Sequence, residues 1–202
     1  MRRIVVLRHG LTSWNAERRF QGQADVGLTE LGVLQAKAAA AALAAYSPVF
    51  VWSSDLIRAR TTAQYVAEAA GVAVAADPRL REVHVGAFQG LTHDEAVERY
   101  GIGPWNYGEY GGESDAATGE RIAAVLTEAA DALGDGQTGL LVSHGAAMRS
   151  GLLTFLGWPL EQVGALGALA NCGWIELTDE PASWFTGAAW RLAAYNRVTP
   201  IS

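Results

Sequence analysis

The chain has almost no cysteine: Cys172 is the only one among its 202 residues. No disulfide can therefore form within the chain, and a reducing compartment is the simpler assumption. The lack of cysteine indicates a cytoplasmic protein.

The sequence also lacks long apolar runs near its start. Residues 4–7 are apolar, but the run meets Arg8 far too soon for a signal-peptide core or a membrane span. A short, β-branched run of this kind is typical of a strand that is buried on both faces. We therefore expect no membrane partner.

Positive charge is scarce as well. Fifteen Lys and Arg residues against 21 Asp and Glu residues give a formal net charge of −6. Such a balance argues against nucleic acid or an anionic membrane as the main partner. Any anion-binding site must be local, built from a few arginines in a pocket.

Strand and helix patterns alternate along the chain. Apolar runs predict buried parallel strands over residues 4–7, 49–52 and 140–143, and two edge strands over 174–177 and 190–192. Helices are predicted over 29–46, 56–70, 92–100, 114–133 and 146–156, with N-caps at Thr29, in Ser53-Ser54-Asp55 and at Ser114. Residues 10–28 and 101–112 are predicted to be loops. This order favours an α/β fold with a mostly parallel sheet, and no repeat or linker divides residues 1–202 into more than one domain.

Two of the predicted strands end in a histidine-glycine pair. The first is Arg8-His9-Gly10 and the second is Ser143-His144-Gly145. Because parallel strands place their carboxyl ends at one edge of the sheet, the two imidazoles can converge there. Arg58, early in the next helix, and Glu82, in a later extended segment, are expected near the same edge.

These side chains suit a phosphate monoester. A neutral imidazole at His9 can attack phosphorus, while the planar forks of Arg8 and Arg58 stabilise the phosphoryl oxygens. A protonated His144 would add a third donor. Glu82 is the best-placed acid for the leaving oxygen, which requires a raised pKa; alternatively, it forms only a surface ion pair with Arg79 or Arg81.

No metal or other cofactor is expected. The four histidines, at positions 9, 84, 93 and 144, lack the spacing of a zinc motif, and no carboxylate cluster suited to magnesium occurs.

The same residues resemble the signature of the histidine phosphatase superfamily, in the branch of the phosphoglycerate mutases and their phosphatase relatives. The resemblance runs in order through Leu7-Arg8-His9-Gly10, Ser53 to Ala59, Leu80 to Gly86, Gly112-Glu113-Ser114 and Val142 to Gly145. It implies a three-layer α/β/α sandwich with a mostly parallel central sheet. It also implies that His9 is the phosphorylated nucleophile, that Glu82 is the proton donor, and that Arg8, Arg58 and His144 bind the phosphoryl group. Asn15, Gln21 and Gly145 are expected to contact the substrate.

Within this family, the segment after the acid favours hydrolysis over phosphoryl transfer. Mutases typically read Glu-Arg-His-Tyr-Gly there and continue with a basic insertion. Here the chain reads Glu82-Val83-His84-Val85-Gly86, and residues 102–112 contain no Lys or Arg. Trp105, Tyr107 and Tyr110 are expected to cover the pocket instead; the alternative is that they only pack the loop. This part of the sequence resembles the broad-specificity and glucosyl-3-phosphoglycerate phosphatases.

The sequence therefore predicts a metal-independent phosphatase that acts on a small-molecule phosphate monoester. Two alternatives remain: a cofactor-dependent phosphoglycerate mutase or phosphotransferase, and a non-catalytic phosphate-binding module. A homodimer is also left open, with Trp184 and Trp190 as candidate interface residues.

Overall fold

The computed structural model describes residues 1–103, 106–179 and 190–200. A six-stranded sheet with the strand order β3-β2-β4-β1-β5-β6 lies at its centre. The strands are β1 (Arg3–Arg8), β2 (Phe50–Ser53), β3 (Val74–Ala76), β4 (Thr138–Ser143), β5 (Trp174–Thr178) and β6 (Arg191–Arg197). The first four are mutually parallel, whereas β5 and β6 run antiparallel to their neighbours. The mostly parallel sheet predicted from the sequence is confirmed.

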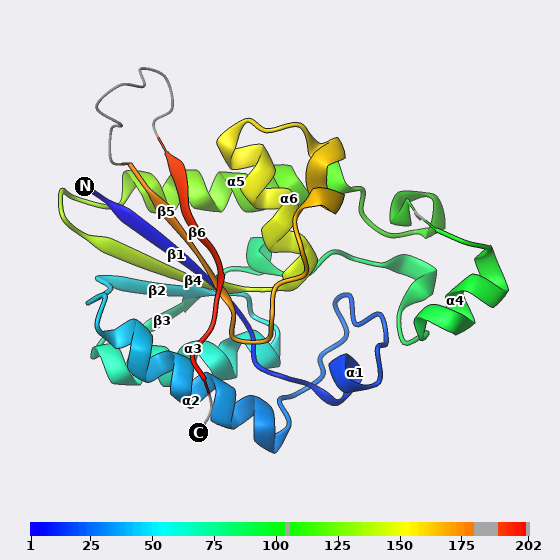
Figure 1. Cartoon of the computed structure of the whole chain (residues 1–202), viewed down its shortest axis with the longest axis horizontal. Helices are drawn as coiled ribbons and strands as arrows, with labels where there is room; N and C mark the ends of the chain where they lie inside the picture. Colours follow the sequence, from blue (N-terminus) through cyan, green and yellow to red (C-terminus); the bar gives the residue numbers. More distant parts are fainter. Residues whose placement is uncertain (104–105, 180–189, 201–202) are drawn as a thin grey trace.

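Helices cover both faces of this sheet (Figure 1). On one face lie α2 (Glu30–Ala44) and α3 (Ile57–Ala70), and on the other lie α5 (Asp115–Asp131) and α6 (Gly145–Leu156). Alternate residues of β1 enter two separate hydrophobic cores: Val5 and Leu7 pack with α2 and α3, and Ile4 and Val6 pack with α5 and α6. The result is the expected three-layer α/β/α sandwich.

A smaller group of elements lies beyond the carboxyl ends of the parallel strands. It contains α1 (Ser13–Ala16), α4 (His93–Tyr100) and the 3-10 helices η2 (Gly86–Phe88) and η3 (Tyr107–Tyr110). Two further 3-10 helices, η1 (Pro78–Leu80) and η4 (Leu160–Ala165), connect the larger elements. An aromatic cluster around Phe88, with Phe20, Tyr100, Tyr107 and Tyr110, holds part of this group together. Tyr110 therefore packs against Phe88, and Trp105 lies outside the described residues.

Three local predictions were wrong. A short helix, α1, lies inside the segment predicted to be a loop, because Thr12 and Asn15 form a capping box across four residues. Helix α3 has no cap from Ser53, Ser54 or Asp55; its N-cap is Leu56, without a side-chain hydrogen bond. Asp25, distant in sequence, instead accepts a hydrogen bond of 2.6 Å from the backbone N–H of Ile57.

The third error concerns β5, which was predicted to be an edge strand. It lies between β1 and β6 and is buried along its whole length, so that only β6 forms the edge on that side. Glu176 is the charged residue within this strand. The carboxylate of Glu176 is nevertheless covered, and it accepts hydrogen bonds from Tyr46, Trp174 and Arg197.

Trp190 packs within its own chain, against the ring of Phe155 and beneath the guanidinium of Arg2. Trp184 lies outside the described residues. Across the described part of the chain, each helix is too short or too polar to cross a lipid bilayer.

Candidate active site

The two histidines that follow β1 and β4 lie side by side. These strands are parallel neighbours, and Arg8 pairs in register with Ser143, so His9 and His144 leave the sheet at adjacent positions. Their ring centroids are 5.1 Å apart, and both side chains are buried. The sheet thus brings together two residues that are 135 positions apart in sequence (144 − 9).

His9 is held in one tautomer. Its Nδ1 lies 2.7 Å from the carbonyl oxygen of Gly10, which can only accept a hydrogen bond. Nδ1 therefore carries the proton, and Nε2 keeps its lone pair. Burial, followed by the charges of Arg58 and Arg8, lowers the pKa of His9 well below its ordinary value. The ring is consequently neutral and nucleophilic at physiological pH.

Arg58 is a buried cation with donors to spare. Its Nη1 and Nη2 donate to the carbonyl oxygens of Ala24 and Gly22, at 2.6 and 2.8 Å. Burial lowers its pKa to about 10, opposed by the nearby carboxylates of Glu82 and Asp25, so it stays charged at neutral pH. With a third bond from Nε to His144, two of its five N–H groups remain for a ligand.

His144 lies behind Arg58. Its Nδ1 accepts a hydrogen bond of 3.2 Å from Arg58 Nε, so the ring proton sits on Nε2, which donates to Ser54 Oγ at 2.9 Å. Burial, followed by the charge of Arg58, lowers the pKa of His144 well below its ordinary value. The protonated form expected from the sequence is not the one that these partners hold. To donate to a phosphoryl group, His144 must exchange one of them.

Arg8 has one buried donor without a protein acceptor. Its Nη1 donates to the carbonyl oxygen of Leu169, but its Nε is buried and has no hydrogen-bond partner among the described residues. An unsatisfied buried N–H on a cation is costly, and an anionic ligand would satisfy it. Gly145 lies directly beside this group, since a Cβ there would be 3.3 Å from Arg8 Nε.

Glu82 caps helix α6. Its Oε1 accepts hydrogen bonds from the backbone N–H groups of Ala147 and Val83, at 2.8 and 3.0 Å, and its Oε2 accepts one from Ala146 at 3.3 Å. The surface ion pair considered from the sequence does not form, because Arg79 pairs with Asp77 and Glu128 and Arg81 pairs with Asp55. Glu82 is thus held by backbone N–H groups at the start of α6, and it lines the same cavity as His9.

These groups line a cavity of about 260 Å³, referred to here as the smaller cavity. Its lining includes Arg8, His9, Asn15, Gln21, Arg58 and Glu82. His144 and Gly145 are not part of that lining, since the first lies behind Arg58 and the second beside Arg8. The structure therefore brings together all eight residues that the sequence singled out, six of them at the cavity surface and two behind it.

Asn15 and Gln21 are oriented by their neighbours. The amide oxygen of Asn15 accepts hydrogen bonds from Thr12 and from Asn171 Nδ2, and the amide oxygen of Gln21 accepts one from Thr12 Oγ1. With the oxygens occupied, the two amide NH₂ groups remain to donate to a ligand.

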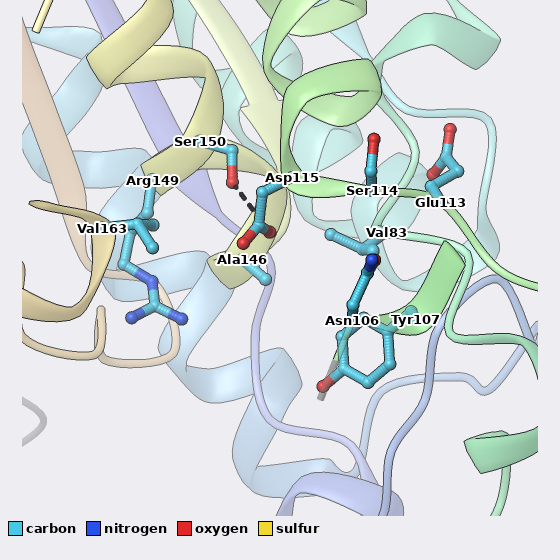
Figure 2. A pocket seen from close by; sticks show the side chains of 10 residues that line it. All are labelled: Val83, Asn106, Tyr107, Glu113, Ser114, Asp115, Ala146, Arg149, Ser150 and Val163. Atoms are coloured by element: carbon cyan, nitrogen blue, oxygen red, sulfur yellow. Dashed lines mark hydrogen bonds between the residues drawn. The ribbon is translucent and has the colours of Figure 1, made fainter. Parts of the chain in front are cut away.

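A larger cavity, of about 610 Å³, is lined by the residues drawn in Figure 2. It adjoins the smaller cavity. The two share Val83, Tyr107, Ala146 and Arg149. The rest of its lining is mostly polar and comes from the segment 106–115 and from the region of α6 and η4: Asn106, Glu113, Ser114, Asp115, Ser150 and Val163. Burial raises the pKa of Tyr107 to about 12, helped by the nearby carboxylates of Glu82 and Asp115, so its hydroxyl is a neutral donor. The expectation that Tyr107 covers the pocket agrees with this position.

Sequence reasoning missed three residues of this region. Arg149 lies one helical turn after Gly145, and this spacing was the available signal that it faces the same edge. Ser54 and Asn171 carried no local signal, because each acts through hydrogen bonds to partners distant in sequence. Asn171 donates to both the carbonyl oxygen of His9 and the side chain of Asn15.

The described residues contain no group of three or more His, Cys, Asp or Glu side chains that could hold a metal ion. The charges that face the smaller cavity are instead those of guanidinium groups and one carboxylate.

An α/β/α sandwich with paired histidines and two arginines at the carboxyl edge of its parallel strands defines a phosphate-handling class of enzyme. Residues 4–192 match the histidine phosphatase superfamily (branch 1), and the chain belongs to that family.

Two curated relatives are similar over nearly their full length. The glucosyl-3-phosphoglycerate phosphatase of Mycolicibacterium vanbaalenii is 36% identical over 220 residues, covering 100% of this chain and 97% of the relative. A probable phosphoglycerate mutase, GpmB, of Serratia proteamaculans is 36% identical over 208 residues, covering 100% of this chain and 95% of the relative. Among solved structures, a mycobacterial glucosyl-3-phosphoglycerate phosphatase in complex with VO3 is similar with a TM-score of 0.86 and 34% identity, covering 97% of this chain and 99% of that one.

Proposed function

We propose that this protein hydrolyses phosphate monoesters through a phosphohistidine on His9. The observation that carries the proposal is the hydrogen bond between His9 Nδ1 and the carbonyl of Gly10, which leaves Nε2 unprotonated at the cavity surface. A neutral imidazole fixed in this tautomer is a nucleophile that needs no separate base.

In the first half of the reaction, His9 Nε2 attacks phosphorus and the bond from phosphorus to the ester oxygen breaks. That oxygen takes a proton from Glu82 and departs as an alcohol. Arg58, with two N–H groups to spare, and Arg8, with its unpartnered Nε, stabilise the phosphoryl oxygens throughout.

In the second half, a water molecule attacks the phosphohistidine and gives a proton to Glu82. The bond from phosphorus to Nε2 breaks, inorganic phosphate leaves, and both side chains return to their initial states. Three backbone N–H groups hold the Glu82 carboxylate in place while it accepts and releases this proton.

The second candidate function is phosphoryl transfer back to a bound phosphoglycerate, as the likeness to a probable phosphoglycerate mutase suggests. The segment 102–112 argues against it, because it offers no Lys or Arg to hold a second acidic substrate. Supplying 3-phosphoglycerate with its bisphosphate decides the matter: hydrolysis predicts phosphate release that outpaces isomerisation.

The first test is the substitution His9→Ala. We expect the wild-type protein to release phosphate steadily from p-nitrophenyl phosphate in excess chelator, and the variant to lose about 10⁴-fold or more in kcat. Acid-labile, base-stable ³²P labelling of the wild type should disappear in the variant. His93→Ala, at an exposed histidine that lines neither cavity, is the matched control and should keep full activity.

Full activity in His9→Ala would overturn the assignment. Phosphate or vanadate binding without turnover on a broad panel of esters would instead support the non-catalytic alternative. The cytoplasmic location and the homodimer expected from the sequence stay predictions.

A further inference from the structure

An arginine outside both cavities donates each of its five N–H groups to the protein. Arg121 lies in the second turn of α5 and lines neither the smaller nor the larger cavity. Its Nη1 donates to the carbonyl oxygens of Arg79 and Arg81, at 2.7 and 2.6 Å. Its Nη2 donates to the carbonyl oxygen of Glu82 at 3.0 Å and to the carboxylate of Glu113 at 2.8 Å. Its Nε donates to the same carboxylate at 2.9 Å, so no N–H group of Arg121 remains for a substrate.

These hydrogen bonds converge on the segment that carries the proposed proton donor. Three of them hold the backbone up to and including Glu82. Glu113 holds the backbone just beyond it, because its carboxylate accepts from the N–H of His84 at 2.8 Å and its own N–H donates to the His84 carbonyl oxygen at 2.7 Å. Burial alone would raise the pKa of Glu113, but the hydrogen bonds from Arg121 and His84 hold that pKa below its ordinary value. The ionised Glu113 and Arg121 thus form a clamp on both sides of the acid, the Arg121–Glu113 clamp.

The side chain of Glu82 is held by a different helix. Its carboxylate accepts hydrogen bonds from the N–H groups of Ala146 and Ala147 at the start of α6, which packs against α5. The backbone of Glu82 is therefore fixed from α5 and its carboxylate from α6. A carboxylic acid protonates the ester oxygen only from hydrogen-bonding distance, and a displacement of about 1 Å can cost about 100-fold in rate. The Arg121–Glu113 clamp thus controls a distance on which proton transfer depends.

We propose that Arg121 is a positioning residue for acid catalysis, which acts through Glu82 and not through contact with the substrate. The inference rests on the proposed function and on the role of Glu82 in it. A residue that only stabilised the fold would affect all esters alike. A residue that positions the acid affects chiefly those esters whose leaving oxygen needs a proton.

A second link between the same segment and α5 offers a comparison. Arg79 donates to the carboxylate of Glu128, at 2.6 and 2.8 Å, and both side chains are exposed. This ion pair joins side chains at the surface, whereas Arg121 binds the backbone of Glu82 itself. Weakening it loosens the attachment to α5 and leaves the hydrogen bonds of the Arg121–Glu113 clamp in place.

The test is Arg121→Lys, measured with two classes of ester. Lysine keeps the charge, but its compact ammonium cannot reach three carbonyl oxygens and a carboxylate at once. The readout is kcat/KM for the best of a panel of alkyl phosphates, such as glycerol 3-phosphate and glucose 6-phosphate, divided by kcat/KM for p-nitrophenyl phosphate. We expect this ratio to fall about 10-fold or more, because p-nitrophenolate leaves without protonation. Arg79→Lys is the matched control and should leave the ratio unchanged.

Two further variants complete the design. Glu113→Gln loosens the Arg121–Glu113 clamp from its other end, should lower the ratio as well, and carries the test if Arg121→Lys does not fold. Arg121→Lys combined with Glu82→Gln should lower the ratio no further than Glu82→Gln alone, because both substitutions act through one carboxyl group.

The proposed function and the role of Arg121 fail on different results. A wild type that hydrolyses no alkyl ester, or an unchanged ratio in Glu82→Gln, rejects the proposed reaction with Glu82 as its acid. Where Glu82→Gln does lower the ratio, three results overturn the role of Arg121 alone. They are an unchanged ratio in Arg121→Lys (or in Glu113→Gln, if that variant carries the test), an equal fall in Arg79→Lys, and a full further loss when Arg121→Lys is added to Glu82→Gln.

Discussion

Burial sets the charge states of the residues in the site. Arg58 is 1% exposed and His9 is 2% exposed, yet one keeps its charge and the other does not. Desolvation disfavours the ionised form of both groups. The ordinary pKa of arginine is so high that Arg58, with its pKa lowered to about 10, is still charged at neutral pH, whereas the lowered pKa of His9 leaves its ring neutral. The same environment therefore yields a cation and a nucleophile side by side.

At the residue scale, Glu82→Gln separates acid catalysis from helix capping. The glutamine oxygen can still accept from the first turn of α6, so we expect only a small change in melting temperature. It cannot donate a proton to the ester oxygen in the way a carboxylic acid does. For an alkyl phosphate we expect kcat to fall about 100-fold or more, and for p-nitrophenyl phosphate much less, because p-nitrophenolate leaves without protonation.

The measurement is kcat for both esters with wild type and variant under the same conditions. Equal losses on the two esters would show that Glu82 acts only through the position of α6, and the acid role would have to be abandoned.

At the element scale, the turn after β1 is held by close packing against α2. A Cβ at Gly10 would collide with the carbonyl of Gly32, and a Cβ at Gly32 would collide with the carbonyl of Leu11. The turn is also bonded to two helices, since Gln35 of α2 accepts from the N–H of Leu11 and Thr62 of α3 accepts from the N–H of Gly10. The position of the His9 imidazole thus depends on α2 and α3 as well as on β1.

Gly32→Ala should therefore harm both stability and activity. The added methyl meets backbone, which cannot move as a side chain would, so we expect the free energy of unfolding to fall by about 1–3 kcal/mol. We also expect kcat to fall about 10-fold, because the turn that carries the carbonyl partner of His9 shifts. Urea unfolding and steady-state kinetics measure the two effects.

Gly27→Ala provides the comparison, because nothing lies within 4 Å of a Cβ at that position. Should Gly32→Ala behave like Gly27→Ala in both assays, the close packing would not be what positions His9.

Elements were predicted well where local pattern determines them. Thr29 and Ser114 cap their helices as predicted, with hydrogen bonds to the backbone three residues later. The predicted cap of α3 was wrong because the side chain that accepts from its first N–H group, Asp25, belongs to another loop. Asp25 and Ile57 are too far apart in sequence for a local pattern to contain both. The prediction that β5 is an edge strand was wrong for a similar reason. The buried carboxylate of Glu176 accepts hydrogen bonds from Tyr46 and Arg197, which lie on other elements.

At the scale of the whole molecule, stability should depend on the two buried histidines. Below the unfolded-state pKa of about 6.5, the unfolded chain binds protons at His9 and His144 that the folded chain, with its lowered pKa values, does not bind. The free energy of unfolding therefore falls as the pH decreases. We expect each histidine to contribute about 1.4 kcal/mol per pH unit below 6.5.

Urea unfolding between pH 7.5 and 5.5 measures this dependence above the range in which carboxylates titrate. His9→Gln, which removes one of the two groups, should flatten the curve by about half. A free energy that stays constant over this range would contradict neutral, buried imidazoles.

The part of the site that could be predicted from the sequence is the part that the sheet positions. His9 and His144 follow recognisable strands, so parallel topology alone predicts their meeting. The tautomer of His9 could be expected as well, because its partner is the carbonyl oxygen of the next residue, Gly10. The tautomer of His144, the unpartnered Nε of Arg8 and the position of Arg149 depend instead on segments that are distant in sequence. Those contacts are fixed only when the whole chain is packed, and no local pattern contains them.

The two cavities share part of their lining, and this affects which acceptor, the alcohol or water, takes the phosphoryl group from His9 in the proposed reaction. If the phosphoryl group moves to His9 as proposed, the alcohol would still lie in the larger cavity, whose lining shares Tyr107 and Ala146 with the smaller one. It is then the nearest nucleophile, and its return attack regenerates the ester. Net turnover requires it to depart so that water can take its place. The residence time of the alcohol thus sets the fraction of phosphohistidine that goes on to hydrolysis. An alcohol that dissociates slowly lowers the rate of net hydrolysis.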